Sequence, residues 1–173
     1  MRATAILPVW AAMLGLAACA PEPQATAQSM ADAAEPAAAM DMSAHNHAGR
    51  HVVVHKSEAC GCCDLWVEHM RKAGFHVEVI TTENIEPVKA RMGVPAGAGS
   101  CHTAEVDGYF IEGHVPASDV VRLLAERPDV RGLAVPGMVI GSPGMEQDGA
   151  GEPYDVVAVA KDGSTSVFAH HGT

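Results

Sequence analysis

The amino-acid sequence predicts an α/β domain: a mixed sheet with helices on both faces, followed by a C-terminal hairpin. Strand-like and helix-like segments alternate between Arg50 and Pro128, which is typical of a sheet covered by helices. Asp-Gly pairs at 107–108 and 162–163 each lie between two strand-like segments, where they favour hairpin turns. The strand-helix-strand order favours a parallel strand pair, and the first hairpin makes the sheet mixed.

The first half of the domain is expected to contain a strand at 50–56 and a helix at 63–74. A second strand at 75–82 and a short helix at 84–93 should follow. The first strand has a β-branched run, and the second alternates apolar and polar positions. In the first helix Trp66 and Met70 share one face, and Gly74 is a stop signal. Pro87 fits the first turn of the second helix.

The later elements are expected to begin with a Gly-rich loop at 94–103, a hairpin at 103–114 and a helix at 116–128. A long loop at 130–153 and a last hairpin at 154–170 should follow. Pro116 opens the helix and Pro128 ends it. The order of elements resembles the thioredoxin and glutaredoxin fold. In that fold the redox motif lies between the first strand and the first helix, and a second loop faces it. Here those places are taken by the segment CGCC at 60–63 and by Cys101 with His102.

The N-terminal part of the chain is expected to lie outside the domain. Arg2 and the apolar run 5–18 are typical of a secretory signal, and the run is shorter than the roughly 20 residues of a membrane-spanning helix. The segment LAAC resembles a lipobox, which predicts lipidation of Cys19; ordinary cleavage after Ala20 is the alternative. The expected organisation is a lipoprotein-type signal peptide, a disordered Ala/Pro and Met/His tether, and a folded domain, at 1–18, 19–49 and 50–173. We therefore expect a periplasmic protein attached to the membrane through a lipid anchor.

The charge and the ligand content of the chain favour cations over nucleic acid. The formal net charge is -10, whereas nucleic-acid binding needs a basic surface. The chain also has ten His and nine Met residues, which are ligands for soft and borderline metals. Binding to nucleic acid is therefore not expected.

Three cysteines, Cys60, Cys62 and Cys63, lie within four positions at the start of a predicted helix. The positive end of a helix favours the thiolate, which is the form that binds metals and attacks disulfides. Together with Cys101 they allow three interpretations: structural disulfides, a thiol-disulfide oxidoreductase that uses Cys60 and Cys63 as its C-x-x-C pair, or a metal site. The third cysteine inside the motif favours the metal site. Soft sulfur ligands favour Cu(I), and a closed tetrahedral zinc site is the simplest alternative.

Other candidate ligands accompany the cysteines. His102 follows Cys101 directly, His114 lies between a strand and a helix, and Met138 and Met145 lie in Gly/Pro-flanked loops. A second set of Met and His residues at the end of the tether resembles copper-scavenging tails: Met40, Met42, His45, His47 and His51.

Three segments together resemble the CopG-type periplasmic copper-resistance family, long described as a domain of unknown function with a metal-binding label. They are KSEACGCCDLWVEHMRKAGFHVEV, GSCHTAEVDGYFIEGHVP and GLAVPGMVIGSPGMEQ, and the resemblance covers residues 50–146. It implies a thioredoxin-like fold, a multinuclear copper cluster on Cys60, Cys62, Cys63 and Cys101, and copper redox chemistry. His102, His114, Met138 and Met145 occupy matching motif positions. Val139 stands where the family is expected to have Pro.

The resulting prediction is an extracytoplasmic copper-binding protein of copper resistance or homeostasis. It would hold Cu(I), as one or several ions, in a cysteine thiolate cluster and interconvert Cu(I) and Cu(II), with Cys60 and Cys63 as the redox-active pair. The expected partners are copper ions and periplasmic copper-export or copper-chaperone proteins. A copper buffer or chaperone without turnover, and a thiol-disulfide oxidoreductase, stay open as alternatives, so the sequence does not decide whether the protein is an enzyme.

Overall fold

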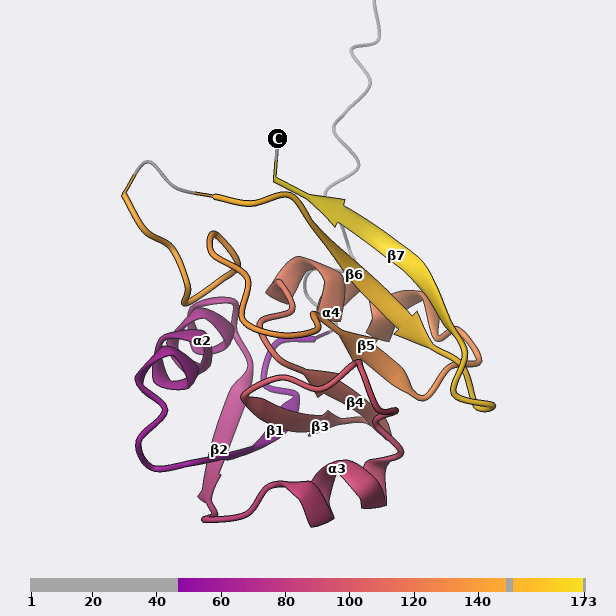
Figure 1. The fold of residues 1–173 in the computed structure, drawn as a ribbon, viewed down its shortest axis with the longest axis horizontal. Helices are drawn as coiled ribbons and strands as arrows, with labels where there is room; N and C mark the ends of the chain where they lie inside the picture. The colour runs from indigo at the N-terminus through magenta and orange to yellow at the C-terminus, as the bar shows by residue number, and fades with distance from the viewer. Residues whose placement is uncertain (1–46, 149–150, 173) are drawn as a thin grey trace, which may run out of the picture. The chain divides into compact units, whose positions relative to one another are not determined.

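The computed structural model describes residues 47–148 and 151–172, which form one mixed sheet with helices packed on it (Figure 1). The described strands and helices are β1 (His51–Lys56), α2 (Gly61–Lys72), β2 (His76–Thr81), α3 (Glu86–Met92), β3 (His102–Val106), β4 (Tyr109–Glu112), α4 (Ala117–Glu126), β5 (Gly132–Ala134), β6 (Tyr154–Val159) and β7 (Thr165–His171). The strand order is β2-β1-β3-β4-β5-β6-β7. The pairs β1/β2 and β4/β5 are parallel and the others are antiparallel, so the predicted α/β class and mixed sheet are confirmed.

The helices cover both faces of the sheet, as the sequence predicts. The larger core lies between the sheet and two helices, where Trp66 and Met70 from α2 and Leu123 from α4 are fully buried. The opposite face carries a smaller core around Phe110, against which Met92 at the end of α3 packs. The predicted shared face of Trp66 and Met70 is therefore confirmed, and α3 lies on the other side of the sheet.

Trp66 connects the first helix to the far side of the larger core. Its indole Nε1 donates a hydrogen bond of 2.8 Å to the carbonyl oxygen of Val115, just before α4. Because the ring is fully buried, this bond satisfies the one polar atom that the side chain brings into the core. Trp66 therefore fixes α2, and with it the cysteine segment, relative to α4.

Two elements differ from the sequence-based expectation. The first helix begins at Gly61 and ends at Lys72, so Cys62 and Cys63 lie inside its first turn and Cys60 is its N-cap residue. The long Gly/Pro segment contains a strand, β5, which pairs with both β4 and β6. A side chain at Gly132 in β5 would clash with the carbonyl oxygen of Phe110, with a Cβ at only 2.1 Å, so the close approach of β4 and β5 requires glycine there.

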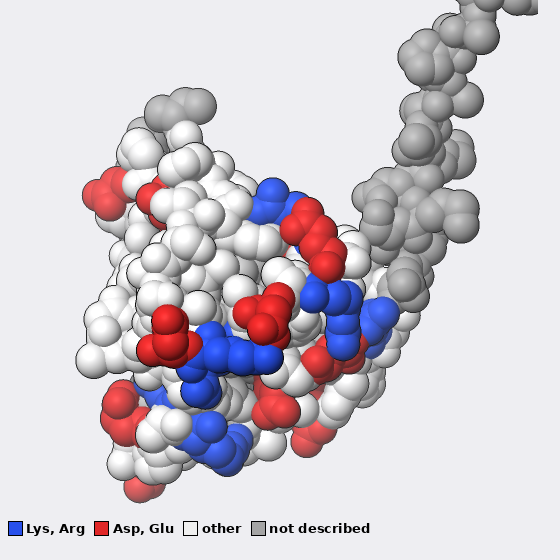
Figure 2. Space-filling view, turned by 90° about the vertical axis from the view of Figure 1, so that its right-hand side faces the viewer, with Lys and Arg blue, Asp and Glu red and all other residues white. Residues whose placement is uncertain are grey.

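Charged side chains of both signs are interspersed on the face that Figure 2 shows. Exposed or half-buried ion pairs among the described residues include Arg127 with Asp107 at 3.4 Å. None of the described helices is long and apolar enough to cross a membrane.

Replacing Leu123 by Ala should lower the free energy of unfolding by about 2–5 kcal/mol, because it removes a fully buried side chain and leaves a cavity in the larger core. The matched control is Leu65→Ala, since Leu65 is also helical but 59% exposed, and this change should stay within about 0.5 kcal/mol of the parent. Urea denaturation followed by circular dichroism measures both. Equal losses in the two variants would contradict the assignment of α4 to the core.

Candidate metal centre

Strand pairing brings the two cysteine segments together at one edge of the sheet. In the antiparallel pair β1/β3, Lys56 at the end of β1 lies opposite His102 at the start of β3. The segment after Lys56 leads to Cys60, and the residue before His102 is Cys101. One register therefore places the loop of Cys101 beside the first turn of α2.

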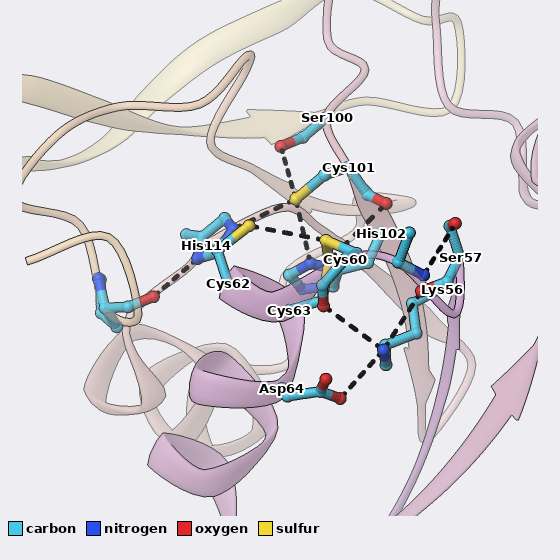
Figure 3. Close-up of a disulfide and its surroundings, with 12 residues drawn as sticks. Lys56, Ser57, Cys60, Cys62, Cys63, Asp64, Ser100, Cys101, His102 and His114 are labelled. Carbon is cyan, nitrogen blue, oxygen red and sulfur yellow. Dashed lines mark hydrogen bonds and ion pairs between the residues drawn. A yellow bond between two sulfur atoms is a disulfide. The ribbon is translucent and has the colours of Figure 1, made fainter.

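The four cysteine sulfurs form one cluster (Figure 3). The Sγ atoms of Cys60, Cys62, Cys63 and Cys101 all lie within 4.8 Å of one another. Cys60 and Cys63 form a disulfide with a Cα–Cα distance of 5.4 Å, while Cys62 and Cys101 are free thiols. The Sγ of Cys62 is 3.5 Å from that of Cys60. The cluster thus combines an oxidised pair with two thiols within reach.

Cys101 is a protonated thiol at neutral pH. Burial raises the pKa of Cys101 to about 11, and the neighbouring Cys62 adds to the shift. The Ser100 hydroxyl opposes this shift with a weak hydrogen bond to the sulfur at 3.9 Å. A metal ion that binds this sulfur must therefore displace its proton.

His114 directs a nitrogen lone pair at Cys101. Its Nδ1 donates to the carbonyl oxygen of Pro143 at 2.7 Å, because a carbonyl oxygen can only accept. Burial lowers the pKa of His114, so the neutral ring leaves Nε2 unprotonated, 3.1 Å from the Cys101 Sγ. A fixed outer hydrogen bond of this kind is common for metal-binding imidazoles.

His102 is the second imidazole beside Cys101. Its Nδ1 is 3.5 Å from the Cys101 Sγ, and its fully buried Nε2 has no hydrogen-bond partner among the described residues. Burial keeps the pKa of His102 well below its usual value. The ring lies 4.4 Å from Trp66 and 5.1 Å from His114, measured between centroids. The ligand atoms of Cys101, His102 and His114 lie within 4.8 Å of one another, so Cys101 belongs to two overlapping donor groups.

The methionines predicted as ligands lie in the loop that follows β5. Met138 is 57% exposed, and Met145 is half-buried. Between them, Gly144 packs against the first turns of α2: a Cβ there would lie 2.9 Å from the Cys62 carbonyl oxygen and 2.8 Å from the Trp66 nitrogen. The loop therefore lies directly over the backbone of the cysteine helix.

The predicted tail ligands are divided between two regions. Met40, Met42 and His45 lie outside the described residues, as do the predicted signal peptide and Cys19. His47 is buried beside Phe75, and its Nε2 lies 2.9 Å from the Ala73 carbonyl oxygen. His51 stacks on His76, with ring centroids 5.3 Å apart, and its Nε2 is 3.1 Å from the Glu78 carboxylate. These two histidines lie near the start of β1, whereas the cysteine segment follows its end.

Two buried lysines donate hydrogen bonds to backbone carbonyl groups of the cysteine segments. Neither lysine was identified from the sequence. Lys56 donates to the carbonyl oxygens of Ser57 at 3.1 Å and Cys60 at 3.3 Å, and pairs with Asp64 at 2.9 Å. Lys89 forms an ion pair with Glu112, whose carboxylate is fully buried. The only sequence signal for this second pair is that Glu112 lies in a strand with apolar neighbours.

Comparison with known proteins agrees with the geometry. A family model described as "Protein of unknown function, DUF411" matches residues 98–145, and the search of curated proteins gave no match. Two solved structures, described as "Copper resistance protein copG- Form 2" and "Copper resistance protein copG- Form 1", are each 44% identical to this chain with a TM-score of 0.69. Each match covers 72% of this chain and 99% of the solved chain. The predicted resemblance is confirmed, and the chain belongs to the CopG family of copper resistance proteins.

Proposed function

We propose that this protein binds copper as cargo in copper resistance or homeostasis, and that Cys60, Cys62, Cys63 and Cys101 hold Cu(I) as thiolates. The observation that carries the proposal is the convergence of the four Sγ atoms within 4.8 Å. Thiolates are soft ligands and favour Cu(I). Two solved structures described as a copper resistance protein share this chain's fold and are 44% identical to it over a match that covers 72% of the chain.

The number of donors favours a cluster of copper ions over a single zinc ion. A structural zinc site is complete with four ligands. Here four sulfurs converge, and the Nε2 of His114 and the Nδ1 of His102 add two nitrogens beside Cys101. Because a thiolate can bridge two Cu(I) ions, this larger donor set suits more than one ion.

The disulfide supplies a two-electron reaction that can be coupled to copper. When Cys60–Cys63 accepts two electrons, the sulfur-sulfur bond breaks and two thiolates form. Two Cu(I) ions provide these electrons and become two Cu(II) ions. In the reverse direction two thiolates reduce two Cu(II) ions to Cu(I) and form the disulfide again. No further oxidant or reductant is needed in either direction.

The proposed place of action is the periplasm, with attachment to the membrane through a lipid on Cys19. The lipobox-like segment LAAC supports the anchor, and the Cys60–Cys63 disulfide is compatible with an oxidising compartment. Copper-export or copper-chaperone proteins are the partners that a periplasmic copper carrier would need.

A thiol-disulfide oxidoreductase is the second candidate. The observation that favours it is the disulfide of a C-x-x-C pair at the N-terminal end of α2. A copper buffer uses the same sulfurs without turnover. Release of Cu(II) after addition of Cu(I) to the oxidised protein separates the redox proposal from the buffer.

The Cys62→Ser variant should lose most of its bound copper, because it removes one of the four converging sulfurs but keeps the C-x-x-C pair. The measurement is an anaerobic Cu(I) titration of the reduced full chain, followed by native mass spectrometry. Metal-free reduction of insulin is the internal control and should not change if Cys60 and Cys63 exchange disulfides. Wild-type copper loading in this variant would contradict the cluster.

Apparent Cu(I) affinity should rise with pH between 6 and 8. Cys101, with a pKa of about 11, keeps its proton across this range, so its displacement alone contributes about tenfold in affinity per pH unit. Competition with a Cu(I)-specific chelator at each pH measures the slope. The slope of the logarithm of the Cu(I) affinity against pH counts the protons released on binding. In the Cys101→Ser variant this slope should be lower by about one. Equal slopes in the variant and the wild type would exclude Cys101 as a ligand.

A further inference from the structure

The peptide groups that lead into Cys101 are held by a buried ion pair. The Ser100 N–H donates to the Glu112 carboxylate at 2.5 Å, and the Ser100 carbonyl oxygen accepts from the Lys89 ammonium group at 2.9 Å. Glu112 is fully buried and Lys89 is 7% exposed. Both backbone polar groups of the residue before Cys101 are therefore fixed by one pair of opposite charges.

The ion pair is in turn fixed to three elements of the fold. Lys89 lies on α3 and Glu112 on β4, while the Thr103 hydroxyl on β3 donates to Glu112 at 2.6 Å and lies 3.3 Å from the Lys89 ammonium. Lys89 and Glu112 also contact each other directly. These bonds leave the carboxylate little freedom to move away from Ser100.

The residue after Cys101 is also held. The His102 carbonyl oxygen accepts from the Gly113 N–H at 3.0 Å, in the turn that follows Glu112. A side chain at Gly113 would lie 2.6 Å from the Ser100 Cβ, so this turn and the cysteine loop are in close contact. Cys101 thus stands between two anchored residues, and its Sγ lies 3.1 Å from the His114 Nε2 and within 4.8 Å of the other three sulfurs.

The energetics of a buried ion pair suggest that Lys89 and Glu112 orient the Ser100 peptide rather than stabilise the fold. Taking two charges out of water costs several kcal/mol per ion, and an apolar pair of similar volume is often equally stable or more stable. The two charges do, however, provide strong hydrogen bonds to a loop peptide that a hydrophobic pair could not provide.

We propose that Lys89 and Glu112 are positioning residues that hold the Cys101 sulfur at the cluster before copper arrives. This inference rests on the proposed function, because it assigns the pair a role in copper binding. Both side chains would act through the Ser100 peptide, which Lys89 binds at its carbonyl oxygen and Glu112 at its N–H.

The test is the double variant Lys89→Met/Glu112→Leu in the reduced full chain. Thermal unfolding of the metal-free protein should show a cooperative transition, since the buried charges are removed together. Cu(I) affinity, measured by chelator competition, should fall by about 10–100-fold, the usual effect of removing groups that orient a metal ligand. The copper count by native mass spectrometry should fall towards that of Cys101→Ser.

The matched control is Tyr109→Phe. Tyr109 lies on β4 like Glu112, but its hydroxyl donates to the Pro128 carbonyl oxygen at 3.0 Å, so the change removes a hydrogen bond and keeps the ion pair and both Ser100 bonds. Its Cu(I) affinity should equal that of the wild type. Wild-type affinity in the folded double variant would overturn the positioning role and leave the proposed function standing. An equal loss of affinity in Tyr109→Phe would also overturn it. A wild-type protein that binds no Cu(I) would instead refute the proposed function.

A second measurement needs no variant. In the metal-free, reduced wild type, hydrogen exchange of the Ser100 amide should be much slower than that of Gly97, an exposed residue of the same loop. Slow exchange shows that the peptide is held before copper binds. Exchange as fast as that of Gly97 would overturn the proposal even if the double variant does not fold.

Discussion

The antiparallel register of β1 and β3 is the constraint on which the site depends. It places Lys56 opposite His102, so the ends of two segments that are far apart in the sequence meet at one edge of the sheet. A shift of one residue would turn every side chain of β3 to the other face. Ala104 and Val106 would then leave the larger core, which makes the register energetically well defined. The convergence of the sulfurs therefore follows from the packing of the core.

At this edge of the sheet the four cysteine sulfurs lie near two imidazoles and two buried lysines. Burial keeps His102 and His114 neutral, so their lone pairs are available without prior loss of a proton. Lys56 and Lys89 lie on the backbone side of the two cysteine segments, where each is paired with a carboxylate and holds peptide carbonyl groups of these segments in place.

Local sequence patterns predicted most of the fold but only part of the site. β1 and β2 follow from β-branched and alternating residues, and the helix around Trp66 follows from its apolar spacing, because these signals act over short distances. β5 has only three residues, Gly132–Ala134, in a Gly/Pro-rich segment, and it forms because two other strands pair with it. The role of Lys89 could not be predicted, since an isolated helix gives no sign that one lysine meets a buried carboxylate. The ring of His47 next to Phe75 is likewise a tertiary contact.

His47 and Gly49 bind the backbone at the C-terminal end of α2, so the described chain begins at the opposite end of the helix from the cysteines. The Gly49 N–H donates to the Gly74 carbonyl oxygen at 2.8 Å, and from there β1 runs from His51 to Lys56 towards the cysteines. Six residues of strand span about 15–20 Å. Chain that precedes His47 thus joins the domain at the end of β1 opposite to the sulfur cluster. The point where the described chain begins and the four sulfurs therefore lie at opposite ends of β1, one strand length apart.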